Sequence, residues 1–170
     1  MNILILNGSP RPGGNTAALA KAFAEGAESA GHSVTQVQVG TMDIRGCIGC
    51  EACRKSGSGK CVQQDDMQIV YPAIQEADMI VLASPVYFWS LTGQMQSAIT
   101  RLYCLGKLKT EKFALILSSG SPNVYDGVNA QFDMLLKWFS GKDMGRFTFN
   151  GGDQQSEENL AKLRAFGASL

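Results

Sequence analysis

NILILNGSPRPGGNT, residues 2–16, is the stretch that decides the fold of this chain. Residues 2–6 form a short unbroken apolar run, which is typical of a strand buried on both faces of a parallel sheet. A loop rich in glycine and proline follows. From Thr16 to about Ala30 the composition changes to Ala, Leu, Lys and Glu with helical spacing, and Gly31 ends the helix. The stretch therefore predicts a strand, a loop and a helix in direct succession.

The same alternation continues along the rest of the chain. Further strands are predicted at residues 33–39, 79–83, 113–117 and 146–149, and further helices at 67–77, 91–105, 128–140 and 157–166. Five successive strand–helix units imply right-handed crossovers and a parallel sheet with helices on both faces. We therefore expect an α/β fold. The length favours a single domain over residues 1–170, interrupted by a Cys-rich insertion at about 41–64.

Charge and hydropathy exclude two classes of partner. The 170 residues include 15 Lys and Arg and 15 Asp and Glu, so the formal net charge is zero. Nucleic-acid binding is not expected, because phosphate contacts need a basic excess. A membrane span is not expected either, because no apolar run approaches the roughly 18 residues required. Residues 2–6 are too short for a signal peptide, and we expect a cytoplasmic protein.

The first loop has the composition of a phosphate cradle. The start of a helix offers free backbone N–H groups and the positive end of the helix dipole. The loop lacks the G-x-G-x-x-G fingerprint of dinucleotide-binding proteins and the lysine of a Walker A loop. The simpler alternative is that Asn15 or Thr16 only caps the helix. The candidate phosphate-binding residues are Ser9, Arg11, Gly14, Asn15 and Thr16.

Two more loops follow the third and fourth predicted strands. Ligands of such sheets bind beyond the carboxyl ends of the strands, so these loops should lie beside the first. Ser84–Ser90 contains three successive aromatic residues, which would cover a flat ligand or a partner subunit; core packing is the alternative. Ser118, Ser119 and Gly120 supply small hydroxyl-bearing or flexible positions in the third loop.

Four motifs together resemble the NAD(P)H-dependent FMN reductases of the flavodoxin-like superfamily. They are Gly-Ser-Pro-Arg-x-x-Gly-Asn-Thr from Gly8, Cys-Ile-Gly-Cys-Glu-Ala-Cys from Cys47, Asp65-Asp66-Met67, and Ser84-Pro85-Val86-Tyr87-Phe88. They occur in the family's order and cover roughly residues 2–105. The resemblance implies a flavodoxin-like three-layer sandwich whose five-stranded parallel sheet has the order 2-1-3-4-5. Within the family, the chain is most similar to the iron–sulfur flavoproteins.

The resemblance also implies cofactors and partners. FMN would bind with its phosphate on the first loop and its isoalloxazine ring at Pro85, Val86, Tyr87, Phe88 and Trp89, with Ser118, Ser119 and Gly120 at the far edge. NAD(P)H would reduce the flavin, which would pass electrons to a small-molecule or protein acceptor. A non-catalytic FMN electron carrier is the alternative. A homodimer or homotetramer is expected, because partner subunits complete the flavin site in the family.

Cys47, Cys50, Cys53 and Cys61 have the spacing C-x2-C-x2-C-x7-C. Two-residue gaps let thiolates converge on one centre, and the loop at 54–60 has the glycines to bring in a fourth. Four thiolates suit either a [4Fe–4S] cluster or zinc. The resemblance to iron–sulfur flavoproteins favours the cluster, although reductases of the wider family can carry such a segment without metal. The metal-ligating prediction is therefore a 4Fe–4S cluster, with zinc and no metal as open alternatives.

Three other features have simpler interpretations. His32 lies between a helix end and an edge strand, and we expect it at the surface. Cys104 is expected to pack as a small hydrophobic residue. Asp65 and Asp66 precede a helix, where negative charge is favoured, so we expect them to cap it.

Overall fold

A computed structural model describes all 170 residues and contains one main parallel sheet. Its strands have the order β2-β1-β3-β5-β6. They are β1 (Asn2–Asn7), β2 (Ser33–Val37), β3 (Met79–Tyr87), β5 (Lys112–Ser119) and β6 (Lys142–Asn150). These are the five predicted strands in chain order, so the predicted order 2-1-3-4-5 is confirmed. A two-residue strand β4 (Ser90–Leu91) pairs antiparallel with the end of β3 and was not predicted.

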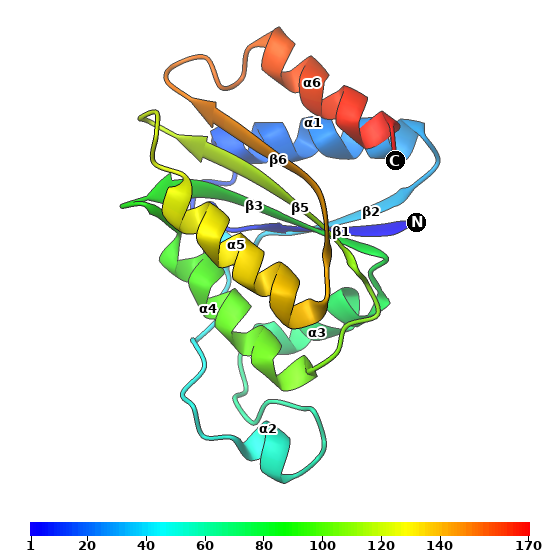
Figure 1. Cartoon of the computed structure of the whole chain (residues 1–170), viewed down its shortest axis with the longest axis vertical. Coiled ribbons are helices and arrows are strands. Elements are labelled where there is room, and N and C mark those ends of the chain that lie inside the picture. The colour runs from blue at the N-terminus through cyan, green and yellow to red at the C-terminus, as the bar shows by residue number, and fades with distance from the viewer.

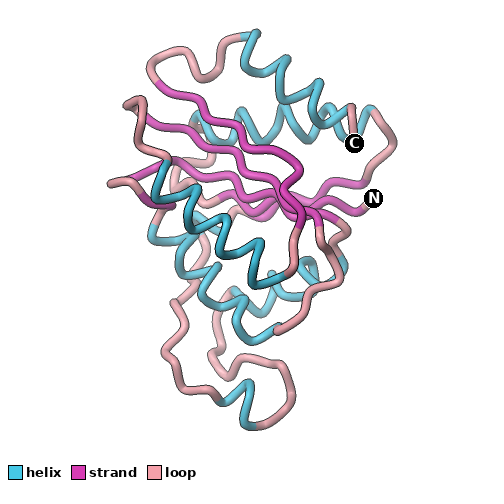
Figure 2. Tube along the Cα trace, in the orientation of Figure 1, coloured by secondary structure: helices cyan, strands magenta, loops and turns pink.

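Helices cover both faces of the sheet (Figure 1). One layer contains α1 (Asn15–Ser29) and α6 (Glu157–Ala168), and the other contains α3 (Met67–Glu76), α4 (Gly93–Arg101) and α5 (Asp126–Phe139). Figure 2 shows the three layers in the same view, with the strands between the two sets of helices. Two short 3-10 segments, η1 (Val39–Thr41) and η2 (Leu102–Leu105), follow β2 and α4. No helix combines the length and apolar character needed to cross a membrane.

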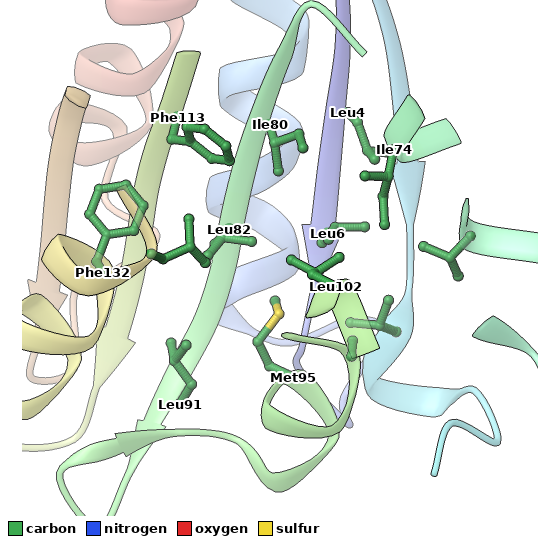
Figure 3. Packing of buried hydrophobic residues seen from close by; sticks show 14 of the residues in the cluster. Leu4, Leu6, Ile74, Ile80, Leu82, Leu91, Met95, Leu102, Phe113 and Phe132 are labelled. Atoms are coloured by element: carbon green, nitrogen blue, oxygen red, sulfur yellow. The ribbon is translucent and has the colours of Figure 1, made fainter. Parts of the chain in front are cut away.

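The unbroken apolar strands are explained by burial on both faces. Leu4 and Leu6 of β1 pack in the cluster that includes residues of α3, α4 and α5, and Figure 3 shows Leu4 near Ile74 of α3 and Leu6 near Leu102. Ile3 and Ile5 pack in a second cluster on the side of α1 and α6. Successive side chains of a strand point to opposite faces, so a central strand with helices on both sides needs apolar residues at every position.

Several boundaries differ from the predictions by a few residues, and local hydrogen bonds explain two of them. The predicted strand at 79–83 continues to Tyr87, because the chain turns back and pairs with β4. The predicted helix at 91–105 begins only at Gly93, where the Thr92 hydroxyl accepts a hydrogen bond from the backbone N–H of Met95 and caps the helix.

The Cys-rich insertion leaves the sheet after η1 and returns at α3. Its only regular element is the short helix α2 (Ala52–Lys55). In Figure 1 this segment extends beyond α3 and α4, on the side away from α1 and α6. The predicted insertion is therefore a peripheral loop on one helical layer.

Candidate functional site

The three predicted loops converge on one pocket of about 340 Å³ at the carboxyl ends of β1, β3 and β5. Every predicted cofactor residue except Phe88 and Trp89 lines it, and Gly151 and Gln154 join them. The lining residues are Ser9, Arg11, Gly14, Asn15, Thr16, Pro85, Val86, Tyr87, Ser118, Ser119, Gly120, Gly151 and Gln154. The parallel sheet brings these segments together because the carboxyl ends of its strands share one edge.

The start of α1 is open to an anion. Gly14 occupies the N-cap position, and no side chain accepts a hydrogen bond from the first turn. The alternative in which Asn15 or Thr16 merely caps this helix is therefore wrong. No acidic residue lies in the first turn, so the helix dipole is not neutralised there. Free N–H groups at a helix start, beside the hydroxyls of Ser9 and Thr16, have the chemistry of a candidate anion-binding site.

Close backbone contacts hold the first loop in place. The Ser9 hydroxyl accepts a hydrogen bond from the backbone N–H of Arg11 at 3.1 Å. On the other side, the Gln38 side chain donates to the Ser9 carbonyl at 2.6 Å. A Cβ atom at Gly40 would lie 2.0 Å from the same carbonyl oxygen, so only glycine allows η1 to approach this closely. The loop is thus preorganised.

Gln154 is a site residue that the sequence interpretation missed. It is buried, donates to the Ser119 carbonyl at 2.8 Å and accepts from the Asn15 side chain at 2.9 Å. It therefore ties the loop after β6 to both the start of α1 and the end of β5. Its surroundings in the sequence, GGDQQS, carry no motif, so only the fold reveals this role.

An aromatic hairpin stands beside the pocket. Phe88 is 90% exposed and Trp89 is 57% exposed, which excludes core packing for both. Their rings meet edge to face with centroids 5.0 Å apart. Together with Val86, Ser119 and other loop residues, they line an adjoining pocket of about 280 Å³. Of the five predicted ring-binding residues, Phe88 and Trp89 thus lie beside the first pocket, while Pro85, Val86 and Tyr87 line it.

The two adjoining pockets fit the chemistry of FMN. One end offers uncapped N–H groups, hydroxyls and the nearby Arg11, which suit a phosphate monoester. The other end offers aromatic surface, which suits a planar ring. The residues that would hold the phosphate and the ring come from different strands and meet only in the fold.

The four motif cysteines line a third pocket, of about 380 Å³, next to α4 and η2. Cys47 and Cys50 are exposed, whereas Cys53 and Cys61 are half-buried. No three His, Cys, Asp or Glu side chains come close enough together to hold a metal ion. The pocket has the donor chemistry of a four-thiolate centre but not its geometry, so the structure gives no support to the predicted cluster.

Cys104 joins the same pocket from η2. It is buried, as expected for a small hydrophobic residue, but its thiol also donates to the Arg101 carbonyl at 3.3 Å. Burial raises the pKa of the Cys104 thiol above its ordinary value, more than the hydrogen bond with Tyr71 lowers it. Cys104 is therefore held as a neutral thiol beside the four motif cysteines.

Asp65 does more than cap α3. One carboxylate oxygen accepts from the Met67 backbone N–H at 3.1 Å, in agreement with the capping prediction for Asp65. The same prediction is wrong for Asp66, whose side chain makes no cap hydrogen bond and accepts instead from the Asp43 backbone N–H at 2.8 Å. The other carboxylate oxygen of Asp65 forms an ion pair with Arg101 at 2.5 Å, and both side chains are fully buried. Burial raises the pKa of Asp65, but hydrogen bonds from Arg101 and from the Arg45 backbone N–H outweigh it, so the net pKa is lowered. No motif in the sequence indicates this ion pair.

Comparison with known proteins identifies the family. The family of NADPH-dependent FMN reductases matches residues 1–155. The chain belongs to this family. This match confirms the resemblance seen in the sequence.

The chain is also similar in sequence to a protein of Archaeoglobus fulgidus named iron-sulfur flavoprotein, which is 37% identical over 121 residues. That match covers 71% of this chain but 53% of the relative, so this reductase family member spans about half the length of that relative.

Solved structures support the flavodoxin-like fold. An NAD(P)H:quinone oxidoreductase from Methanothermobacter marburgensis has a TM-score of 0.72 at 19% identity, over 99% of this chain and 95% of that chain. A flavodoxin from the domain Archaea has a TM-score of 0.64 at 16% identity, with the same coverage of both chains. The predicted flavodoxin-like α/β fold is therefore confirmed.

Proposed function

We propose that this chain is an FMN-dependent oxidoreductase that takes electrons from NAD(P)H and passes them to a small-molecule or protein acceptor. One observation carries the proposal: the uncapped start of α1 and the loops after β1, β3 and β5 form a single pocket beside exposed aromatic residues. Membership of the NADPH-dependent FMN reductase family supports the same activity.

In this proposal the chain binds and orients the flavin. The N–H groups at the start of α1, with Ser9 and Thr16, hold the phosphate, and Gln154 keeps Asn15 and Ser119 in register across the pocket. FMN rather than FAD is expected, because there is one phosphate cradle and no second pyrophosphate motif. When bound, FMN supplies the hydride and single-electron chemistry, so the chain needs no acid or base of its own.

Exposed aromatic residues mark the side from which a second substrate enters. Phe88 and Trp89 project from the tip of the hairpin next to the proposed ring site. They provide a surface against which a nicotinamide cofactor, an acceptor or a partner subunit can pack. We propose that a homodimer or homotetramer covers part of this surface.

Rapid mixing with NADPH tests the proposal. The protein is purified, its flavin is released and identified, and the FMN-loaded chain is mixed anaerobically with NADPH in a stopped-flow instrument. Bleaching of the flavin absorbance within milliseconds to seconds is expected. Bound FMN without bleaching by NADPH or NADH would instead favour the non-catalytic electron carrier, and absence of flavin binding would refute both.

A second candidate is electron transfer through an iron–sulfur centre at the Cys-rich loop. It is favoured by the four motif cysteines lining one pocket and by the name iron-sulfur flavoprotein carried by the relatives. Because no three of these thiols converge, metal binding would require the loop to change shape. Iron analysis, described below, tests this candidate separately from the flavin chemistry.

A further inference from the structure

The two ends of the Cys-rich loop are joined to each other by hydrogen bonds. Here the entry stem means residues 44–46, and the exit stem means residues 63–65. The Gln63 side chain donates to the Gly46 carbonyl at 3.0 Å, and Arg45 donates to the Gln64 carbonyl at 2.7 Å. The motif cysteines all lie between the two stems, so the geometry of the stems sets where the thiols can go.

Arg101, at the end of α4, is the centre of this connection. Its side chain is fully buried and lines the cysteine pocket. One terminal nitrogen donates to the Arg45 carbonyl at 2.9 Å and to Asp65 at 2.5 Å, and the other approaches the Gln63 carbonyl at 3.5 Å. Its Nε donates to the Tyr71 hydroxyl at 3.2 Å. A single guanidinium thus contacts both stems and α3.

The planar guanidinium suits this role in a way that no other side chain does. It presents several N–H donors in fixed directions, so it can bond to two carbonyls, a carboxylate and a hydroxyl at once. A lysine ammonium would keep the charge beside Asp65 but could not reach all four acceptors. If Arg101 served only as a counter-ion for Asp65, lysine would be an adequate replacement.

Helix α4 also connects this site to the flavin pocket. At its start, the Thr92 hydroxyl donates to the Gly8 carbonyl in the first loop at 2.7 Å. At its end, Arg101 holds the stems of the cysteine loop. Nine residues of helix separate the two, a distance of about 14 Å along the axis at 1.5 Å per residue. One rigid element therefore spans both places.

We propose that Arg101 is a positioning residue that clamps the two stems of the Cys-rich loop and thereby fixes the thiols relative to the flavin pocket. Arg101 acts through the stems and touches no reacting group. The functional role of this contact rests on the proposed flavin chemistry. Whether Arg101 holds the two stems together does not, because the alkylation rates of the cysteines report it without any flavin reaction.

The test compares Arg101→Lys with the wild-type chain. Both proteins carry FMN, are reduced anaerobically, treated with a chelator and alkylated with iodoacetamide, and the rate at each cysteine is followed by mass spectrometry. In R101K, alkylation of the half-buried Cys53 and Cys61 should accelerate by about tenfold or more. This is the factor expected when the loss of a hydrogen bond to a charged group lowers the free energy needed to open the loop locally and expose the thiols. Cys47, already exposed, should change by less than about twofold.

Arg164→Met is the control, because Arg164 also forms ion pairs, with Glu25 and Glu157, but lies on α6, on the opposite face of the sheet. It should leave all thiol rates unchanged. Rates in R101K equal to those of the wild type would overturn the proposal and reduce Arg101 to a counter-ion. If R101K does not fold, the double variant R101Q/D65N, which removes both buried charges together, is compared in the same way.

Flavin reduction by NADPH is measured on the same samples. If Arg101 clamps the stems, R101K should show faster alkylation of Cys53 and Cys61 while FMN remains bound. A wild-type chain whose FMN neither NADPH nor NADH reduces would refute the proposed oxidoreductase function, yet the thiol rates would still decide whether Arg101 clamps the loop. The two failures are therefore distinguishable.

Discussion

The hydroxyl groups of Thr16 and Ser118 lie 2.8 Å apart, although 102 positions separate them in the chain. The contact joins the first turn of α1 to the end of β5 inside the proposed phosphate pocket. Two of the three predicted loops are thus linked by a buried hydrogen bond. Such a bond keeps both hydroxyls oriented before any ligand arrives, which reduces the ordering cost of binding.

Replacing Ser9 and Thr16 together with alanine should weaken FMN binding by about a hundredfold or more, because each hydrogen bond to a charged group contributes roughly 1.5–3 kcal/mol. Quenching of FMN fluorescence on titration with the apoprotein measures the affinity. Ser169→Ala, at the exposed end of α6, is the control and should bind FMN like the wild type. Unchanged affinity in the double variant would show that the phosphate lies elsewhere.

The turn that carries the exposed aromatic rings has a strained backbone. Phe88 and Trp89 both have positive φ angles, 50° and 59°, in a two-residue turn that normally favours Asn-Gly. Phe88→Asn with Trp89→Gly should therefore stabilise the apoprotein, raising Tm by about 3 °C or more, since such strained residues cost about 1–3 kcal/mol each. NADPH-dependent flavin reduction should fall. A lower Tm would indicate that the rings stabilise the chain itself.

Asp65 should contribute to stability in a pH-dependent way. Its pKa in the folded chain lies below its ordinary value, so the ionised form stabilises the native state. This contribution is present in full above the unfolded pKa of about 3.9 and is lost as the pH falls through the lower folded pKa. Asp65→Asn should lower the free energy of unfolding at pH 7 by about 3–5 kcal/mol, because it leaves Arg101 buried without its partner.

Urea unfolding between pH 3 and pH 7 measures this effect. The difference between wild type and D65N should shrink as the pH falls below about 4. Asp78→Asn is the comparison: its pKa is also lowered, by the Asn2 backbone N–H and by Lys109, but its side chain is only half-buried and its loss should matter less at pH 7. A pH-independent difference between wild type and D65N would contradict the assignment.

Iron content decides the role of the motif cysteines. If the loop takes up a cluster, anaerobic purification or reconstitution should give iron and sulfide together, with a broad absorbance shoulder near ~400 nm beneath the flavin bands, as is typical of thiolate-bound clusters. Cys50→Ala should remove both, whereas Cys104→Ala, which changes a thiol of the same pocket outside the motif, should keep them. Less than about one iron per chain after reconstitution would leave the thiols without a cluster.

Oligomeric state tests the proposed cover over the hairpin. Light scattering at micromolar concentration, with FMN bound, should give the mass of a dimer or a tetramer, because exposed aromatic clusters of this kind are typical of interaction surfaces. The Phe88→Asn and Trp89→Gly variant should shift the mass towards the monomer. A monomeric wild-type protein would mean that the exposed rings serve a ligand rather than a subunit.

Local sequence determined the architecture because strands and helices have different hydrophobic periods. The run at residues 2–6 had to be a doubly buried strand, and the glycine-rich loop before α1 had to leave helix N–H groups free. From these, the alternation of strands and helices and the residues of the first loop could be predicted, whereas the sheet order and the proposed ring-site residues came from the resemblance to the FMN reductases. The parallel sheet alone brings its three loops to one edge.

Tertiary structure decided the contacts between segments that are distant in the chain and carry no motif. Gln154 enters the pocket only because β6 ends beside β5, and Asp65 finds Arg101 only because α3 and α4 lie in the same layer. The same holds for the cysteines: their spacing indicates that four thiols can meet, but the stems held by Arg101 determine where each thiol lies. Hydrophobic periodicity depends only on residues that are neighbours in the sequence. A buried hydrogen bond between distant segments depends on which surfaces come into contact in the complete fold.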